Sequence, residues 1–211
     1  MTTCNQDTVR VGIELGTLQA FQKRTFDLFF SALGLLVVWW LILLAWIAAS
    51  IDTRSNGFFI QKRVGRNGKL FRVIKIKTMR PNHSLDTTVT RRGDPRITAL
   101  GALFRRTKID ELPQLWNVFL GDMSFVGPRP DVPGFADQLS GEERAMLSIR
   151  PGITGPATLK YRNEEELLAS QDDPESYNRE VIWPDKVRIN LEYIQSWSLT
   201  QDLRYIIQTV F

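Results

Sequence analysis

The sequence LFFSALGLLVVWWLILLAWIAASI, residues 28–51, decides how this chain is organised. It carries no charged residue and is bounded by Asp27 and Asp52. At about 1.5 Å per residue a helix of this length extends roughly 36 Å, enough to cross the roughly 30 Å hydrocarbon core of a bilayer. The apolar region of a cleaved signal peptide is much shorter, about 7 to 15 residues. The run therefore predicts a membrane-embedded helix over residues 23–52, preceded by an N-terminal extension over residues 1–22.

The charges on either side of this run leave its topology open. Lys23 and Arg24 precede it, and residues 53–81 carry nine Lys and Arg with no acid. By the positive-inside rule the C-terminal flank lies in the cytoplasm. Two basic flanks fit either a helix that enters and leaves by the same face of the membrane or a true span. In a true span the less basic N-terminal flank would lie outside the cytoplasm.

The basic charge extends over half of the chain. Residues 1–109 carry 18 Lys and Arg against 6 Asp and Glu, whereas residues 110–211 carry 9 against 17. A basic half predicts an anionic partner, which can be phospholipid head groups, a phosphorylated small molecule or nucleic acid.

Residues 53–211 are long enough for one catalytic domain with a core of ordinary size. Phe58–Val64 and Leu70–Lys77 are rich in β-branched and aromatic residues and flank Asn67-Gly68, which predicts a hairpin. Helices are expected over Leu112–Leu120, over Ser140–Ile149 behind a Ser140/Glu143 capping box, and at the C-terminus. The apolar stripe of the C-terminal helix can seal the core or lie in the membrane interface. We predict a helix-rich α+β fold with a small β-hairpin and amphipathic interface helices.

Two residue counts restrict the chemistry. The 211 residues include one cysteine, Cys4, and one histidine, His83, which excludes an intramolecular disulfide and histidine-rich zinc sites. No P-loop or dinucleotide-binding motif is present. Any catalysis must rest on carboxylates, basic residues, hydroxyls or a hard metal ion.

Asp110 and Glu111 are the strongest candidates for that chemistry. They precede a helix start fixed by Pro113, where the helix dipole favours a negative charge. Arg105, Arg106 and Lys108 lie just upstream, so we predict a lowered pKa and an ionised Asp110. An ionised Asp can act as a nucleophile and a neighbouring Glu can hold Mg²⁺. The alternative is that Asp110 only caps the helix and Glu111 faces solvent.

Two further segments have the character of anion-binding loops. Arg129 stands between Pro128 and Pro130, so its guanidinium is presented from a stiff backbone. Arg150 opens a segment whose glycines, Gly152 and Gly155, allow a close backbone approach or a tight turn.

Together these segments resemble the bacterial sugar transferase family, the small monotopic polyprenyl-phosphate phosphoglycosyl transferases. The likeness runs from about Lys23 to the C-terminus. It is carried by Lys23-Arg24-x-x-Asp27, Gln61-x-Arg63-Val64-Gly65, Lys75-Ile76-Lys77-Thr78-Met79, Asp94-Pro95-Arg96-Ile97-Thr98, Arg105-Arg106-Thr107-x-x-Asp110-Glu111-Leu112-Pro113-Gln114-Leu115-x-Asn117-Val118, Gly121-Asp122-Met123-Ser124-Phe125-Val126-Gly127-Pro128-Arg129-Pro130 and Arg150-Pro151-Gly152-Ile153-Thr154-Gly155.

The resemblance implies an enzyme that moves a sugar phosphate from a UDP-sugar to a polyprenyl (undecaprenyl) phosphate, releases UMP and begins a surface glycan. It implies that Asp110 is the nucleophile, which forms a phosphosugar-aspartyl intermediate, and that Glu111 binds Mg²⁺. Substrate binding is implied for four basic residues: Arg129, Arg105, Arg150 and Lys77.

The resemblance also implies a location. It places the apolar helix as a re-entrant segment in the bacterial inner (cytoplasmic) membrane, with the lipid bilayer as a partner and the catalytic domain on the cytoplasmic face. Trp39 and Trp40 stand where the family commonly has Ser-Pro, so the sequence leaves the re-entrant and spanning topologies both open. No nucleic acid is expected as a partner, and a homo-oligomer is left open.

Two other functions compete with this interpretation. One is a membrane-tethered module that binds anions or nucleic acid without chemistry, which leaves the Asp110-Glu111 pair unexplained. The other is a metal-dependent nucleotide-sugar hydrolase that uses the same residues. The sequence does not indicate which sugar or glycan is involved.

Overall fold

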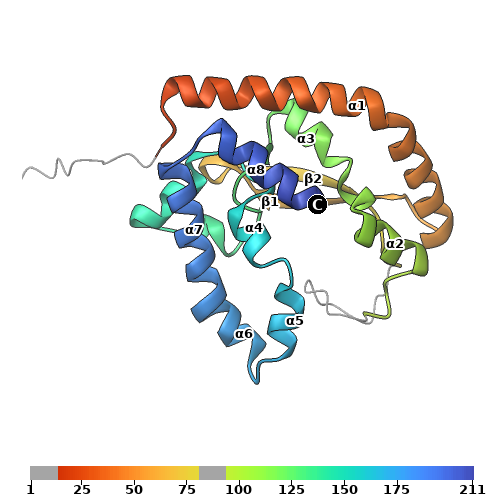
Figure 1. The fold of residues 1–211 in the computed structure, drawn as a ribbon. Coiled ribbons are helices and arrows are strands. Elements are labelled where there is room, and N and C mark those ends of the chain that lie inside the picture. The colour runs from red at the N-terminus through yellow and green to blue at the C-terminus, as the bar shows by residue number, and fades with distance from the viewer. Residues whose placement is uncertain (1–13, 81–93) are drawn as a thin grey trace, which may run out of the picture.

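The fold is dominated by one long helix laid against a small mixed domain (Figure 1). In the computed structural model, residues 14–80 and 94–211 are described; Cys4 and His83 lie outside these residues. Helix α1, Thr17–Thr53, is 37 residues long and unbroken. Among the described residues it is the helix that is long and apolar enough to cross a membrane, and it begins earlier than the predicted residue 23.

Helix α1 presents one small-residue and polar stripe to the domain. Lys23, Asp27 and Ser31 are buried near its start, and Ala45 and Ala49 near its end. Only 11% of its most apolar 18-residue window is buried. Its other faces expose large apolar side chains: Leu28, Phe29, Phe30, Leu33, Leu36, Val37, Trp39, Trp40, Leu43, Leu44, Ile47 and Ile51.

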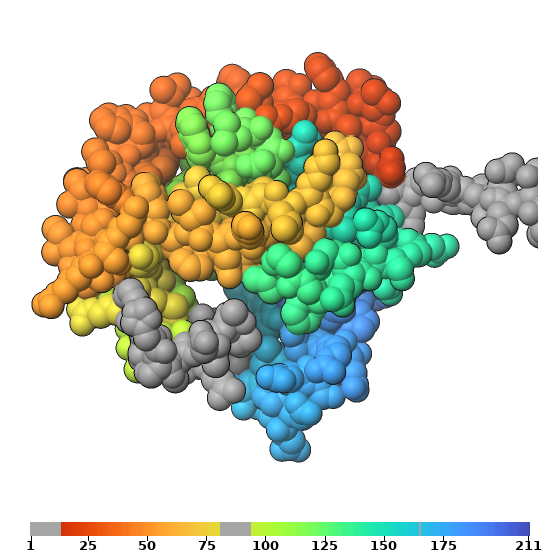
Figure 2. Space-filling model, turned by 180° about the vertical axis from the view of Figure 1, so that it is seen from behind, coloured from red at the N-terminus to blue at the C-terminus, as the bar shows by residue number. Residues whose placement is uncertain are grey.

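The two ends of α1 are fastened to the same domain. The Lys23 Nζ atom lies 2.6 Å from Asp202 Oδ2 of the C-terminal helix, and Asp27 Oδ1 accepts hydrogen bonds from Ser124 Oγ and the Phe125 amide. At the other end Ala45 and Ala49 pack in a core cluster with Ile76 and Phe104. Figures 1 and 2 show that α1 runs along one edge of the molecule and then bends down its side.

The predicted hairpin is confirmed. Strands β1, Phe58–Val64, and β2, Leu70–Ile76, pair antiparallel with Phe58 opposite Ile76 and Val64 opposite Leu70. The connection contains the 3₁₀ turn η1, Arg66–Gly68, in which Asn67 and Gly68 adopt positive φ angles of 58° and 77°. Asn and Gly reach this left-handed region at little steric cost.

A second, parallel pair of strands joins the two glycine-containing segments. Strand β3, Ser124–Val126, pairs with β4, Gly152–Thr154. The backbones approach so closely that a Cβ atom added to Gly152 would lie 2.2 Å from the Gly127 amide nitrogen, far inside contact distance. The glycines of these segments therefore serve the strand pairing.

Short helices complete the domain. They are α2, Ala99–Thr107; η2, Ile109–Glu111; α3, Gln114–Leu120; η3, Ala136–Gln138; η4, Gly141–Ser148; α4, Pro156–Lys160; α5, Glu164–Ala169; α6, Pro174–Tyr177; η5, Asn178–Ile182; α7, Trp183–Gln195; and α8, Leu199–Val210. The helix-rich α+β class is confirmed, with the apolar helix and the β-hairpin in the expected places.

One predicted helix has a different form. The segment after Ser140 is a 3₁₀ helix rather than an α-helix, and the Ser140 side chain makes no capping hydrogen bond. Gly141 has a φ of 56°, which is left-handed. A first residue in that conformation cannot start a right-handed α-helical turn, so the capping box does not form.

The apolar side chains of the C-terminal helix α8 divide between the core and the exposed surface. Leu199 and Ile206 pack against the cluster formed by Val126, Tyr193 and Trp197. The remaining apolar side chains of α8 are exposed: Leu203, Ile207, Val210 and the terminal Phe211.

Candidate active site

The Asp110-Glu111 pair lies in η2, directly before α3. Lys108 separates α2 from η2 with a left-handed φ of 59°. Helix α3 is held against β2 by Asn117, whose Nδ2 donates to the Arg72 carbonyl at 2.7 Å and whose Oδ1 accepts from the Ile74 amide at 3.1 Å. This side-chain bridge places the η2 turn beside the β-hairpin.

Glu111 is the meeting point of two cations. The Lys75 Nζ atom on β2 lies 3.0 Å from Glu111 Oε1, and Arg129 Nη2 lies 3.9 Å from the same oxygen. Burial alone would raise the pKa of Glu111, but Lys75 and Arg129 outweigh it and hold the pKa below its ordinary value. Glu111 is thus an anionic carboxylate, turned inward rather than facing solvent.

Asp110 differs from its neighbour in charge environment. It is buried, with 8% of its surface exposed. Burial raises its pKa above the ordinary value, and the negative charge of Glu111 adds to this effect. Lys75, Lys108 and Arg105 act in the opposite direction without outweighing it. The predicted lowering of the Asp110 pKa is therefore wrong, because the sequence showed the nearby cations but not the depth of burial.

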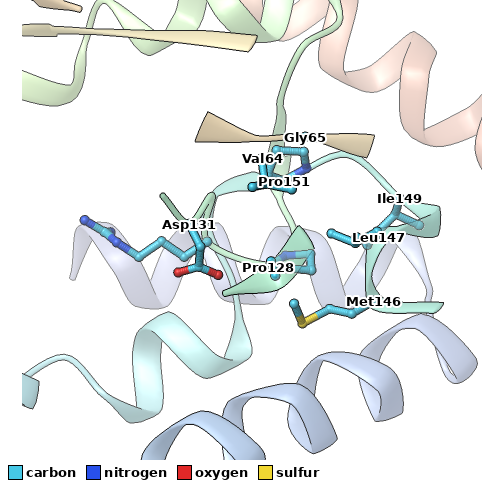
Figure 3. A pocket seen from close by; sticks show the side chains of 10 residues that line it. Val64, Gly65, Pro128, Asp131, Met146, Leu147, Ile149 and Pro151 are labelled. Carbon is cyan, nitrogen blue, oxygen red and sulfur yellow. The ribbon is translucent and has the colours of Figure 1, made fainter. Parts of the chain in front are cut away.

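The loop that carries Arg129 is held by a hydrogen bond from strand β1. Arg63 on β1 donates from Nη1 to the Pro130 carbonyl at 3.2 Å. A small pocket beside the loop is lined by Arg129, Asp131, Met146, Leu147 and Ile149 among others. Figure 3 shows Asp131 at one end of this pocket and Met146, Leu147 and Ile149 at the other. Neither Asp110 nor Glu111 lines it, so this pocket belongs to the support of the loop.

The other predicted binding residues have different neighbours. Lys77 Nζ donates to Ser55 Oγ at 2.9 Å, and Arg105 Nε donates to Thr78 Oγ1 at 3.0 Å. Arg105 contributes to the charge environment of Asp110. Arg150 points elsewhere: its Nε donates to the Gly121 carbonyl at 2.7 Å, at the C-terminal end of α3. Its role in substrate binding stays a prediction.

Two cations of the site were not singled out from the sequence. Lys75 shares its motif with Lys77, and the two have equal claims by sequence. Tertiary packing decides between them, because η2 meets β2 where Lys75 reaches Glu111, whereas Lys77 donates to Ser55. In the sequence, Arg63 stands out only as a member of the motif Gln61-x-Arg63-Val64-Gly65. The available signal was that Arg63 precedes Val64, which is buried, along β1, so the two side chains point to opposite faces of the strand.

The donor set suits a hard cation that is completed by substrate. Mg²⁺ is commonly bound through one or two carboxylates together with substrate phosphates. Glu111 engages Lys75 and Arg129 through Oε1, while its Oε2 has no hydrogen-bond partner among the described residues. Asp110 Oδ1 is likewise buried without a partner. Over those same ranges no cluster of three or more His, Cys, Asp or Glu forms a protein-only cage.

The face around the hairpin is uneven. Figure 2 shows it hollowed beneath the hairpin, between the hairpin and the α5–α6 segment. The start of the α5–α6 segment is held to α7. Lys160 and Tyr161 both contact Asp185, and Glu164 forms an ion pair with Lys186. Glu164 and Asp185 are thus partners in ion pairs that hold this part of the chain together.

Comparisons with known proteins show which family the chain resembles. The family model described as "Bacterial sugar transferase" matches residues 18–211. The chain is 39% identical over 197 residues to the undecaprenyl-phosphate glucose phosphotransferase of Komagataeibacter xylinus, covering 90% of this chain and 35% of that protein. It is 34% identical over 206 residues to the UDP-glucose:undecaprenyl-phosphate glucose-1-phosphate transferase of Caulobacter vibrioides, covering 95% and 70%.

A third relative is shorter. The exopolysaccharide production protein ExoY of Sinorhizobium fredii is 30% identical over 204 residues, covering 89% of this chain and 83% of ExoY. The chain thus spans about a third of the first relative and most of the other two. With its family model matched over nearly its whole length, the chain belongs to the bacterial sugar transferase family.

Proposed function

We propose that this protein transfers a sugar 1-phosphate from a UDP-sugar to undecaprenyl phosphate and thereby starts a surface glycan. The observation that carries the proposal is the buried Asp110-Glu111 pair, set against Lys75 and Arg129 in a domain that is fastened to a membrane helix. The names of the relatives support the acceptor, since two of them contain undecaprenyl phosphate.

The reaction has two displacements at one phosphorus. In the first, an Asp110 oxygen attacks the β-phosphorus, the new O–P bond forms, and the P–O bond to the bridging oxygen breaks. UMP leaves with that electron pair. In the second, an oxygen of undecaprenyl phosphate attacks the same phosphorus and breaks its bond to Asp110. The carboxylate is regenerated and the product is a lipid diphosphate sugar.

The side chains of this site suit such a reaction, which depends on positioning and charge stabilisation. Arg129 is presented by its two prolines and binds a phosphate of the donor, while Lys75 holds Glu111 in place. Glu111 would hold Mg²⁺, which would supply charge neutralisation at the diphosphate. Arg105 and Lys77 add positive charge near the pair.

The location follows from how α1 is attached. A water-soluble domain that contacts both ends of one helix must lie on a single side of the bilayer. We infer that α1 is re-entrant despite Trp39-Trp40, with the domain on the cytoplasmic face of the inner membrane. The acceptor phosphate lies at head-group level on that face. The exposed apolar side of α8 suits the same interface.

Replacing the nucleophile tests the chemistry. Asp110→Asn keeps the size and removes the nucleophilic oxygen, so UMP release from UDP-sugars should fall by at least about 10³-fold, the scale on which loss of a catalytic group is felt. A panel of UDP-sugars with Mg²⁺ and undecaprenyl phosphate identifies the donor, and intact mass measures the adduct. An active Asp110→Asn enzyme with an unchanged adduct would refute the assignment of the nucleophile.

Replacing Glu111 tests the metal role. Glu111→Gln keeps the shape but lowers the affinity for a hard cation, so activity should require at least about tenfold more Mg²⁺. The measurement is a Mg²⁺ titration of UMP release after chelation. The control is Glu143→Gln, an exposed carboxyl on η4, which should leave the titration unchanged. A Glu111→Gln curve that superimposes on the parent curve contradicts the role.

The competing functions give different results in the same assays. UMP release that continues without a lipid acceptor indicates a nucleotide-sugar hydrolase. Salt-dependent nucleic-acid binding without turnover indicates a binding module.

A further inference from the structure

Two buried polar atoms near the reacting carboxylate have no partner. Gln114 is 3% exposed, and its Nε2 donor makes no hydrogen bond. Asp110 Oδ1, an acceptor, is in the same condition. An unpaired buried polar group costs about 1–3 kcal/mol, and native proteins keep few of them. One orphaned donor and one orphaned acceptor therefore occur in the same short segment.

The two side chains lie close together along the chain, at the junction of η2 and α3. Across this junction the Leu112 amide donates to the Ile109 carbonyl and the Leu115 amide to the Leu112 carbonyl, so the tightly wound η2 leads directly into α3. Three residues beyond Gln114, the Asn117 side chain is hydrogen-bonded to β2 and to Asp122. Gln114 thus lies between a satisfied structural amide and the unsatisfied carboxylate.

We propose that Gln114 is a positioning residue for the transfer reaction, an inference that rests on the proposed function. When the donor is bound, the Gln114 amide donates to Asp110 Oδ1 and fixes the carboxylate so that Oδ2 faces the β-phosphorus. The two side chains form no hydrogen bond with one another in the structure, so this step requires a change of side-chain rotamer. Catalytic hydrogen bonds commonly tighten only in the substrate complex.

A purely structural amide predicts the opposite pattern of effects. If Gln114 served packing alone, an apolar residue of similar volume would remove an unsatisfied donor and leave turnover intact. If Gln114 positions Asp110, the same substitution stabilises the protein without substrate but slows the chemical step. Loss of groups that orient catalytic residues typically costs about 10–100-fold in activity.

The test compares Gln114→Met with Gln201→Met. Gln201, on α8, is the matched control because its Oε1 is also buried without a partner. For Gln114→Met we expect an unchanged or higher Tm, a KM for the UDP-sugar within about twofold, and kcat lowered about 10–100-fold. For Gln201→Met we expect kcat and KM at parental values. A parental kcat in Gln114→Met overturns the inference, as does an equal loss in the control.

Two further variants keep the inference testable if Gln114→Met fails to fold. Gln114→Glu keeps the length and the acceptor oxygen but replaces the donor by a group that repels Asp110. It should be at least as slow as Gln114→Met, whereas Gln114→Asn, which keeps a donor, should recover part of kcat. Equal activity of the Glu and Asn variants overturns the inference. A parental enzyme that releases no UMP refutes the proposed function and the inference with it; an active parent matched by Gln114→Met refutes the inference alone.

Discussion

At the scale of single residues, charge and burial have opposite effects on the two adjacent acids. Glu111 reaches Lys75 and keeps a low pKa, while Asp110 is buried without a comparable partner and has a raised one. The environments of both acids result from one tertiary contact, the packing of η2 against β2. Adjacent residues of the same kind thus acquire different roles because the chain turns between them.

Asp131 gives a residue-scale prediction outside the reacting pair. Burial raises its pKa to about 6, although Lys186, Arg63 and Arg129 act against this. The folded state holds this proton more tightly than the unfolded state, so stability is highest below the unfolded pKa and falls as pH rises from about 4 to about 6. Asp131→Asn removes this loss. The variant should be more stable than the parent by about 1–3 kcal/mol at pH 8, since each pKa unit corresponds to about 1.4 kcal/mol.

The measurement is denaturant unfolding in detergent at pH 4.5 and pH 8. The difference between variant and parent should shrink toward zero at the lower pH. Gln138→Asn, which changes an exposed and non-ionisable side chain on η3, serves as control and should show no such trend. A difference that is equal at both pH values contradicts the burial argument.

At the scale of elements, the close approach of α2 to the chain after β2 places Arg105. A Cβ atom added to Gly101 would lie 2.1 Å from the Thr78 carbonyl oxygen, which is backbone and cannot yield. One turn later Arg105 reaches the Thr78 hydroxyl. Helix α2 is therefore seated at a distance that only glycine permits.

This contact predicts that a Gly→Ala substitution in α2 lowers the stability of the protein, although the same substitution in an exposed helix usually raises it. Gly→Ala inside an exposed helix stabilises by up to about 1 kcal/mol. Gly101→Ala should instead destabilise by about 1–3 kcal/mol, the usual cost of overpacking. Thermal unfolding measures it, with Ala102→Ser on the exposed side of α2 as a control expected within about 0.5 kcal/mol. A stabilised Gly101→Ala protein would show that α2 is not seated as described.

At the scale of the whole molecule, the attachment of α1 predicts its topology. Lys23 pairs with Asp202, which also accepts from Tyr193 and Trp197, in a buried network. Breaking such a pair costs several kcal/mol, so the start of α1 cannot leave the domain easily. Both flanks of the apolar run should therefore lie on the same side of the membrane.

Single cysteines test this topology in a Cys4→Ser background. Gln22→Cys marks the N-terminal flank of the apolar run and Lys69→Cys marks the hairpin tip; both positions are exposed. In sealed inverted vesicles, a membrane-impermeant maleimide should label both, whereas in intact cells it should label neither. Labelling of the two positions from opposite sides would establish a true span.

By itself the sequence determined the elements whose signals are local. The charge-free run, the Asn67-Gly68 turn, the helix after Pro113 and the acidic pair were all predictable, because hydrophobicity, turn chemistry and motif order act over short distances. It did not determine the 3₁₀ form after Ser140, which depends on the left-handed Gly141. It did not determine the parallel pairing of β3 with β4, which depends on glycine contacts between distant segments.

Only the tertiary structure decided which cation meets Glu111 and in which direction the pKa of Asp110 shifts. Lys75 and Lys77 are equivalent along the strand until register and packing bring one of them to η2. A carboxylate pKa depends on desolvation, which is set by everything packed around it. Burial and long-range pairing are properties of the assembled fold, and for that reason they are absent from a linear pattern of residue types.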